Sequence, residues 1–184
     1  MVLGILNDEF MIIHKHNPVE HIKSRIKTPE SIIKKLNNKN CELTIENMME
    51  YIRDIAGIRI VCSFLPDIYE IVEIIKKSNN IKILEEKDYI KNPKTSGYSS
   101  YHLIVEVPVS LSNGTEYVKA EIQIRTVAMD FWASLEHKIQ YKFSGIIPAE
   151  VEEALLKNSK IINNLDIQMS DLNDVVKNYD KTTC

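Results

Sequence analysis

The sequence predicts an α/β protein in which a mixed β-sheet is flanked by helices, with a long helix at the C-terminal end. Residues 57–64 form a compact run rich in β-branched side chains, which is typical of a buried strand. Segments with apolar residues at helical spacing lie on both sides of this run and alternate with further strand candidates. Asn113-Gly114 separates two of those candidates and is a strong signal for a hairpin turn. This order of elements predicts a mixed sheet with helices packed against it.

The first elements are predicted to be helices. Apolar positions over 19–36 fall at helical spacing, and Pro29 stands where a first helical turn accepts proline, so we expect a helix over 29–36. Thr44 is a typical N-cap, which predicts a short helix over 44–52. The buried strand described above follows this helix.

The remaining elements alternate between helix and strand, with proline, glycine and asparagine at the boundaries. In order, we expect a helix over 66–78, a strand over 81–84, a polar loop over 85–100, strands over 102–107 and 117–124, a helix over 127–143, and a last helix that begins at Pro148. No internal repeat is visible in the chain.

Size and composition predict a single cytoplasmic domain that spans residues 1–184. The chain is 44% hydrophobic and 27% charged, as in an average globular protein. No apolar run approaches the ~18 residues that span a bilayer, and the opening MVLGIL is too short for a signal peptide. The 3 cysteines include no C-x-x-C pair, which favours a reducing compartment and argues against a cysteine zinc site.

The last helix carries a strict heptad pattern over 149–180. Its seam has one polar member, Asn158, and steps alternately by four and three residues through Val151, Leu155, Asn158, Ile162, Leu165, Met169, Leu172, Val176 and Tyr179. Two interpretations are open: the helix docks on its own domain, or it packs against a helix of another subunit.

Several well-known catalytic motifs are absent from the sequence. It has no P-loop, no H-E-x-x-H, no G-x-S-x-G and no G-x-G-x-x-G. Its five histidines are scattered and show no spacing typical of metal ligands. A metal site would therefore be built from oxygen ligands, which favours Mg²⁺ or Mn²⁺.

Ionisable residues gather at two predicted strands. Glu121, Gln123 and Arg125 alternate along one strand and therefore share a face, while Asp54 precedes the strand that contains Arg59. Alternating polar residues most often mark a solvent-exposed face. A carboxylate, an amide and a guanidinium beside a second carboxylate also suit a site for Mg²⁺ and a general base.

The net charge of −3 argues against a general nucleic-acid binder, and DNA is not expected as a partner. Basic residues nevertheless cluster over 23–39, and the polar loop places lysines before aromatic residues. Cationic side chains bind phosphates, and an aromatic ring can stack on a nucleobase. We therefore expect a pocket for two phosphorylated ligands, with Arg25, Lys27, Lys35 and Arg59 on one side and Lys87, Lys94, Tyr98 and His102 on the other.

Six segments closely resemble, in colinear order, the synthetase domain of the RelA/SpoT family. They are RIKTPESIIKK (25–35), DIAGIR (54–59), KDYIKNPK (87–94), GYSSYH (97–102), EIQIRT (121–126) and AMDFWASLEH (128–137). The resemblance runs from about residue 10 to the end of the chain. It is greatest to the small, stand-alone alarmone synthetases, and in particular to their RelP branch.

The resemblance implies a nucleotidyltransferase-like fold and an activity in the stringent response. The activity is that of a GTP pyrophosphokinase, which transfers pyrophosphate from ATP to the 3′-hydroxyl of GDP or GTP and gives (p)ppGpp and AMP. Small alarmone synthetases form homotetramers through terminal helices, so the resemblance also implies a homo-oligomer.

The resemblance assigns roles to individual residues. ATP is bound by Arg25, Lys27, Ser31, Lys35 and Arg59, with the two arginines on the adenine and the others on the phosphates. Asp54 and Glu121 are the catalytic carboxylates and bind Mg²⁺, and Glu121 alternatively takes the 3′-hydroxyl proton. The guanine nucleotide that accepts pyrophosphate is bound by Lys87, Lys94, Tyr98, His102, Gln123 and Asp130, with Tyr98 stacked on the base.

Two other functions fit parts of this pattern. A catalytically inactive nucleotide- or RNA-binding module would keep the pocket but would not need both Asp54 and Glu121. A nucleotidyltransferase that extends a polymer would share the fold, but it normally carries a D-x-D pair beside a Gly-Ser motif, and the near match at 86–88 lacks the Gly-Ser. The sequence leaves open whether GDP, GTP or GMP is the preferred acceptor.

Overall fold

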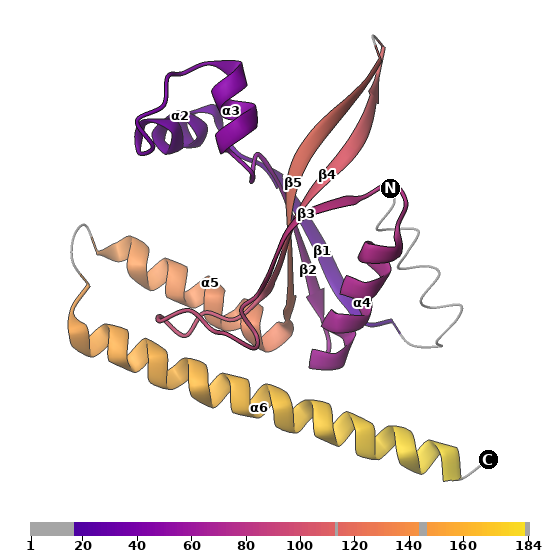
Figure 1. The fold of residues 1–184 in the computed structure, drawn as a ribbon. Coiled ribbons are helices and arrows are strands. Elements are labelled where there is room, and N and C mark those ends of the chain that lie inside the picture. The colour runs from indigo at the N-terminus through magenta and orange to yellow at the C-terminus, as the bar shows by residue number, and fades with distance from the viewer. Residues whose placement is uncertain (1–16, 113, 144–146, 183–184) are drawn as a thin grey trace.

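The protein is built on one mixed, five-stranded sheet (Figure 1). The computed structural model describes residues 17–112, 114–143 and 147–182. The strands are β1 (Val19–Ile26), β2 (Ala56–Cys62), β3 (Lys82–Asp88), β4 (Tyr101–Leu111) and β5 (Gly114–Thr126). Their spatial order is β1-β2-β5-β4-β3, with β2 and β5 parallel and every other pair antiparallel. The predicted mixed sheet is confirmed.

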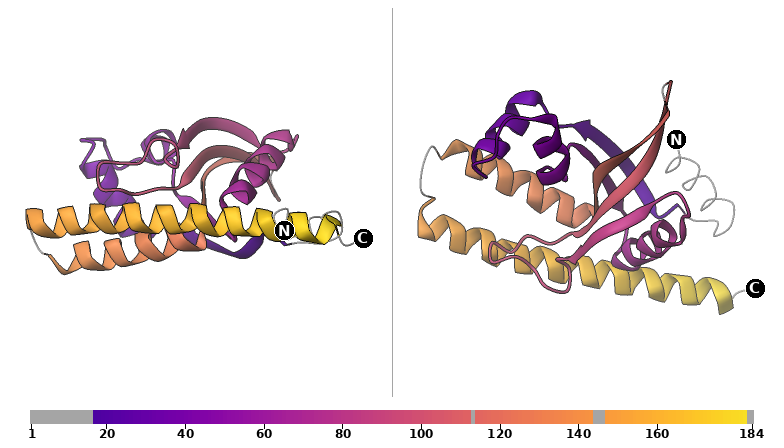
Figure 2. Two further views of the ribbon diagram at one scale, coloured as in Figure 1. Left: turned by 90° about the horizontal axis from the view of Figure 1, so that it is seen from below. Right: turned by 45° about the horizontal axis from the view of Figure 1, so that its top comes forward.

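Among the described residues, five helices accompany the sheet: α2 (Pro29–Asn37), α3 (Ile45–Tyr51), α4 (Leu65–Lys77), α5 (Val127–Lys142) and α6 (Ala149–Thr182). Threonine side chains cap three of them, because Thr28, Thr44 and Thr126 each accept a hydrogen bond from the backbone N–H three residues later. Helices α5 and α6 run side by side (Figure 2). Within the described segments, no helix combines the length and apolar character needed to cross a membrane.

The prediction of helical periodicity over 19–28 is wrong, because the chain forms strand β1 there. This strand lies at the edge of the sheet and pairs only with β2, from Val19 opposite Cys62 to Ile26 opposite Ala56. Only Val19 is partly buried, so the strand shows no clean alternation of apolar and polar residues. The other edge strand, β3, likewise extends four residues beyond the predicted 81–84, into a polar segment that was expected to be a loop.

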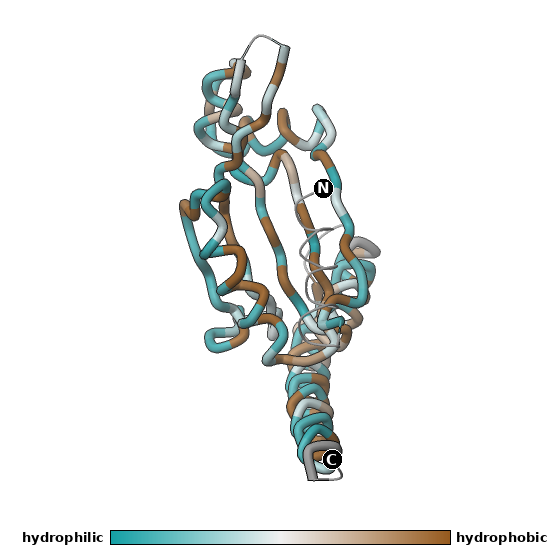
Figure 3. The backbone as a smooth tube through the Cα atoms, turned by 90° about the vertical axis from the view of Figure 1, so that its right-hand side faces the viewer, coloured by the Kyte–Doolittle hydropathy of each residue, from teal (hydrophilic) through white to brown (hydrophobic). Residues whose placement is uncertain are grey.

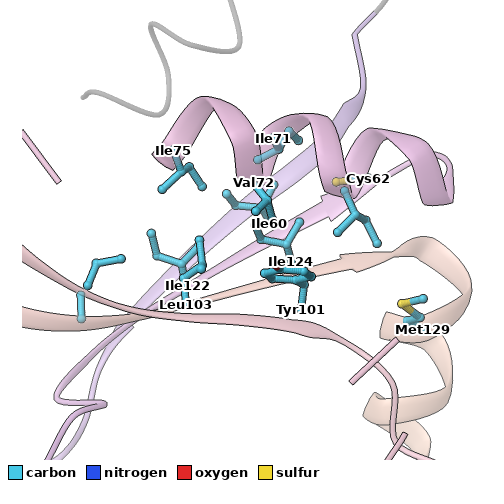
Figure 4. Close-up of a cluster of buried hydrophobic side chains, with 13 residues drawn as sticks. Ile60, Cys62, Ile71, Val72, Ile75, Tyr101, Leu103, Ile122, Ile124 and Met129 are labelled. Carbon is cyan, nitrogen blue, oxygen red and sulfur yellow. The ribbon is translucent and has the colours of Figure 1, made fainter. Parts of the chain in front are cut away.

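The hydrophobic core lies between one face of the sheet and α4 (Figure 4). Helix α4 presents Ile68, Ile71, Val72 and Ile75 to Ile60, Leu103, Ile122, Ile124 and other side chains of β2, β4 and β5. The strands carry both hydrophobic and hydrophilic residues (Figure 3), and along β5 the two kinds alternate from Val118 to Arg125. Burial of each large aliphatic side chain contributes about 1.5–3 kcal/mol, so this face fixes the sheet and leaves the opposite face free for polar side chains.

The hairpin between β4 and β5 extends beyond the other strands (Figure 1). The two strands pair as far as Leu111 opposite Gly114, which confirms the predicted hairpin, while Asn113 of the turn lies outside the described residues.

Helix α6 docks through buried polar residues together with the half-buried N-terminal part of the heptad seam, Val151, Leu155 and Ile162. Ser159, Asp166 and Ser170 are buried. Thr126 Oγ1 donates a hydrogen bond to Asp166 Oδ2 at 2.5 Å, and Leu65 N donates to Ser170 Oγ at 3.3 Å. The C-terminal half of the seam is exposed, since Leu165, Met169, Leu172, Val176 and Tyr179 are 47–70% accessible.

Candidate active site

Strand register places two rows of functional side chains on the sheet face opposite the core. The first row crosses all five strands through Lys23, Arg59, Gln123, His102 and Lys87. The second row runs through Arg25, Gly57, Glu121, Ile104 and Glu85. Residues two apart on a strand share a face, so both rows face the same side of the sheet. This face therefore collects polar residues that lie far apart in the sequence.

Asp54 lies in the loop before β2 and is held by two lysines. Its carboxylate oxygens accept hydrogen bonds from Lys27 Nζ at 2.7 Å and from Lys35 Nζ at 2.8 Å. Partial burial acts to raise the pKa of Asp54, but the two lysines outweigh it and hold the pKa below its ordinary value. Asp54 is therefore ionised at neutral pH, with two cations directed at it.

Glu121, on β5, is fixed by a hydrogen bond on each carboxylate oxygen. Gln123 Nε2 donates to Oε2 at 3.0 Å, and His102 Nδ1 lies 3.0 Å from Oε1. An ionised carboxylate only accepts hydrogen bonds, so His102 carries a proton on Nδ1. The hydrogen bond from His102, with a smaller contribution from Gln123, holds the pKa of Glu121 below its ordinary value, although burial and nearby Asp54 act to raise it.

Two pockets meet at these carboxylates. We define the lysine pocket, of about 450 Å³, by the cationic and aromatic residues Lys35, Lys39, Arg53, Lys87, Tyr89, Lys94 and His102. We define the arginine pocket, of about 280 Å³, by Lys23, Arg25, Arg59 and Gln123. Asp54 and Glu121 line both pockets. A group transferred between ligands of the two pockets would therefore pass beside both carboxylates.

Most of the residues predicted for the site are brought together here. Of the predicted residues, the pocket walls contain Arg25, Lys35, Asp54, Arg59, Lys87, Lys94, His102, Glu121 and Gln123. Lys27 binds Asp54 behind them. Arg59 Nε is buried and has no hydrogen-bond partner among the described residues, so it retains a donor for a ligand.

Five predicted residues occupy places other than those expected from the sequence. Lys35, expected on the same side as Arg25 and Arg59, lines the lysine pocket. Ser31 is exposed on α2 and hydrogen bonds with Thr28, while Gln123 lines the arginine pocket rather than the lysine pocket. The Asp130 carboxylate lies 3.1 Å from Arg59 and 3.2 Å from Arg125. Tyr98 lies outside both pocket linings and bonds through its hydroxyl with His102 Nε2 at 2.8 Å.

Sequence reasoning missed the roles of Tyr89, Arg53 and Arg125. Tyr89 lines the lysine pocket, and its ring packs edge-on against Tyr98 and His102 with centroids 6.2 and 5.2 Å away. The signal for Tyr89 was its place two residues after Lys87. Arg53 pairs with Glu85 in the same pocket. Arg125 had been placed on the functional face of β5, but without a role.

Helix α6 supports the loop that carries Tyr98. Gly97 has a φ of +87°, and a Cβ atom there would overlap Ser159 Oγ on α6. We expect Gly97→Ala to strain the backbone and to push the loop from α6, which should lower both the melting temperature and the affinity for a ligand of the lysine pocket. Calorimetric titration of GDP together with a thermal melt would measure this, and unchanged affinity would contradict it.

The Asp54 and Glu121 carboxylates suit Mg²⁺ that is bound jointly by protein and substrate, rather than a metal ion that is bound by protein side chains alone. Within the described segments, no group of three or more His, Cys, Asp or Glu side chains is placed to hold a metal ion. Mg²⁺ usually binds through one or two carboxylates together with substrate phosphates and water. Asp54 and Glu121, which face two pockets rich in cations, provide that kind of donor set.

Two cationic pockets that meet at a pair of ionised carboxylates define an enzyme that transfers a phosphoryl group between two phosphorylated substrates. Comparison with known proteins identifies the family. The family model described as the region found in RelA/SpoT proteins matches residues 24–146. GTP pyrophosphokinase YwaC of Bacillus subtilis is 53% identical over 166 residues, which are 90% of this chain and 79% of the relative.

Solved structures agree with this result. The small alarmone synthetase 1 of Bacillus subtilis, bound to its product pppGpp, is 36% identical with a TM-score of 0.88, over 95% of this chain and 89% of that one. The small alarmone synthetase 2 of the same organism is 48% identical with a TM-score of 0.82, over 94% and 92% of the chains. The chain belongs to the RelA/SpoT family and is a small alarmone synthetase, a GTP pyrophosphokinase.

Proposed function

We propose that this enzyme makes (p)ppGpp where its two pockets meet, by transferring pyrophosphate from ATP to the 3′-hydroxyl of GDP or GTP with release of AMP. The observation that carries the assignment of the site is that Asp54 and Glu121 line both pockets. Solved relatives bound to pppGpp and to AMPCPP support a guanine nucleotide and an adenine nucleotide as the ligands.

ATP occupies the arginine pocket in this proposal. Arg25 and Arg59 hold the adenine between two flat guanidinium groups, which stack on rings in a way that lysine cannot. Lys27 and Lys35 direct their ammonium groups toward Asp54, where the reacting phosphates of ATP would lie. Ser31 stands four residues before Lys35 on the same helix, so its hydroxyl contributes from the same side.

The acceptor nucleotide occupies the lysine pocket. Lys87 and Lys94 provide cations for its 5′-phosphates, and Lys94 Nζ lies 4.8 and 4.9 Å from the ring centroids of Tyr89 and Tyr98. Tyr98 lies next to the pocket lining, against Lys94, Tyr89 and His102, and its ring is the proposed stacking partner of the guanine. Gln123 lines the arginine pocket and Asp130 pairs with Arg59 there, so in this proposal they reach the acceptor nucleoside from the side where the two pockets meet. A carboxylate can accept hydrogen bonds from guanine and would disfavour adenine.

Asp54 and Glu121 would hold Mg²⁺ in this enzyme. The ion would neutralise phosphate charge as it develops during transfer. Glu121 receives the proton of the 3′-hydroxyl, because its carboxylate is ionised and held in place by His102 and Gln123. Asp54, with Lys27 and Lys35, keeps the pyrophosphoryl group of ATP in line with that hydroxyl.

We further propose that the enzyme is a homo-oligomer, most simply a tetramer, in which α6 (149–180 in the predicted domain 1–184) packs against another subunit. The exposed apolar residues of the heptad seam support this proposal. Because ATP and guanine nucleotides are metabolites of the cytoplasm, we place the enzyme there.

The direct test is incubation of the protein with ATP, Mg²⁺ and GDP, GTP or GMP in turn, followed by separation of the products by anion exchange. We expect AMP and a guanine nucleotide with two added phosphates in equal amounts. Chelation of the metal with EDTA should stop the reaction. Binding of both nucleotides without product would instead identify an inactive binding module.

The role of Tyr98 is tested by removing its ring or only its hydroxyl. We expect Tyr98→Ala to weaken GDP binding by about 1–3 kcal/mol, the range for loss of a base–aromatic stack. Tyr98→Phe keeps the ring and loses only hydroxyl contacts, so its effect should be smaller. Titration of GDP against each variant measures the difference, and equal losses would assign the effect to the hydroxyl.

A further inference from the structure

Arg125 is a buried cation that lines neither pocket. It is the penultimate residue of β5 and is only 4% exposed. A charged group is costly to bury unless its hydrogen-bonding groups are satisfied. The side chains that offset the cost of burying the Arg125 charge therefore indicate the role of this residue.

The guanidinium of Arg125 reaches four side chains from three parts of the chain. Nη2 donates to Tyr98 Oη at 2.5 Å and to Gln123 Oε1 at 2.9 Å. Nη1 donates to Asp130 Oδ1 at 3.2 Å, and Nε contacts Ser100 Oγ at 3.4 Å. The Arg125 Cζ atom also lies 5.1 Å from the centroid of the Tyr98 ring.

These contacts close a ring of hydrogen bonds around the acceptor side of the site. Because Tyr98 Oη accepts from Arg125, its own proton is free for His102 Nε2 at 2.8 Å. His102 Nδ1 donates to Glu121, Gln123 also donates to Glu121, and Gln123 accepts from Arg125. The ring thus joins Arg125 to both oxygens of the Glu121 carboxylate by two separate routes.

We propose that Arg125 is the positioning residue of the acceptor site: it fixes Tyr98 and Gln123, and through them His102 and Glu121, without touching either nucleotide. The inference rests on the proposed placement of the acceptor in the lysine pocket. Lysine cannot replace arginine in this role, because one ammonium group lacks the flat fork that reaches Tyr98 and Gln123 together.

The alternative is that Arg125 serves only to neutralise Asp130. Arg59 already approaches the same Asp130 oxygen at 3.1 Å, so that carboxylate keeps a cationic partner without Arg125. A purely structural role would change the fraction of folded protein, and hence kcat, but would leave the KM values of the folded enzyme unchanged.

The test compares Arg125→Lys, which retains the charge, with Arg125→Gln, which removes it. For every variant that folds, we expect the KM for GDP to rise about 10- to 100-fold, as expected for loss of hydrogen bonds from a charged donor. The KM for ATP should rise less than the KM for GDP, because Tyr98 and His102, unlike Gln123 and Glu121, do not line the arginine pocket. Ser100→Ala, which alters a buried Arg125 contact outside the ring, is the matched control and should keep both KM values.

A double-mutant cycle gives a second, independent readout. Tyr98→Phe alone should raise the KM for GDP measurably, though by less than Tyr98→Ala, and it should add little in the Arg125→Lys background, because both changes break the same ring. Equal rises in both KM values, a loss of kcat alone, additive effects in the cycle, or failure of both Arg125 variants to fold would each overturn the proposal. Failure of the wild-type enzyme to form product would instead refute the proposed function.

Discussion

Replacement of Asp54 by asparagine is expected to reduce alarmone synthesis by about a thousandfold, the effect of losing a group that stabilises the transition state. Asparagine has the same shape, so the fold should survive, but the negative charge that Lys27 and Lys35 surround would be lost. Two cations would then face each other across a neutral group, and Mg²⁺ would lose a ligand. Turnover should be measured at saturating Mg²⁺, and a rate within tenfold of wild type would contradict the assignment.

Glu121→Gln should have nearly the same effect, because the amide can neither receive the hydroxyl proton nor bind the metal as a carboxylate does. Glu116→Gln is the matched control. Glu116 lies on the same strand, is exposed and lines neither pocket, so its loss should leave turnover close to wild type. A thermal melt of each variant would separate loss of chemistry from loss of fold.

Two aspartates in the exposed seam of α6 are expected to break the assembly. Leu165 and Leu172 are 52% and 54% exposed, so Leu165→Asp with Leu172→Asp costs the isolated subunit little. At a subunit interface the same change would bury unpaired charges, which costs several kcal/mol. Light scattering should then show smaller particles or loss of soluble protein.

The control for this experiment adds the same charges elsewhere on the helix. Asn164 and Gln168 are exposed polar residues of α6 outside the seam, and their joint replacement by aspartate should leave the particle size unchanged. A wild-type chain that scatters light as a monomer at micromolar concentration would refute the assembly.

The sequence predicted the parts of the fold that have strong local signals. The helix that begins at Pro29 has a proline and a threonine cap, and the strand before Phe64 is rich in buried aliphatic residues. Strand β1 was missed because it is an exposed edge strand: its hydrogen bonds are supplied by β2, more than 30 residues later, rather than by any local pattern.

The candidate site was predictable only along single elements. Because residues two apart on a strand share a face of the sheet, Glu121 and Gln123 lie on the same face in any fold that keeps this strand. The contact of Asp130 with two arginines and the ring around Arg125 depend instead on how β2, β5 and the loop before β4 come together. Such register is a property of the folded sheet, and no spacing in the sequence encodes it.

The contact between Gly97 and Ser159 makes α6 a thermodynamic link as well as a support. One face of this helix touches the loop of the acceptor site, and the same helix carries Leu165 and Leu172 on its exposed surface. A partner that shifted α6 relative to this loop would therefore change acceptor affinity, and bound acceptor would change the affinity for that partner by the same factor. In a self-associating enzyme that partner is the enzyme itself, so its own concentration becomes an effector of its activity.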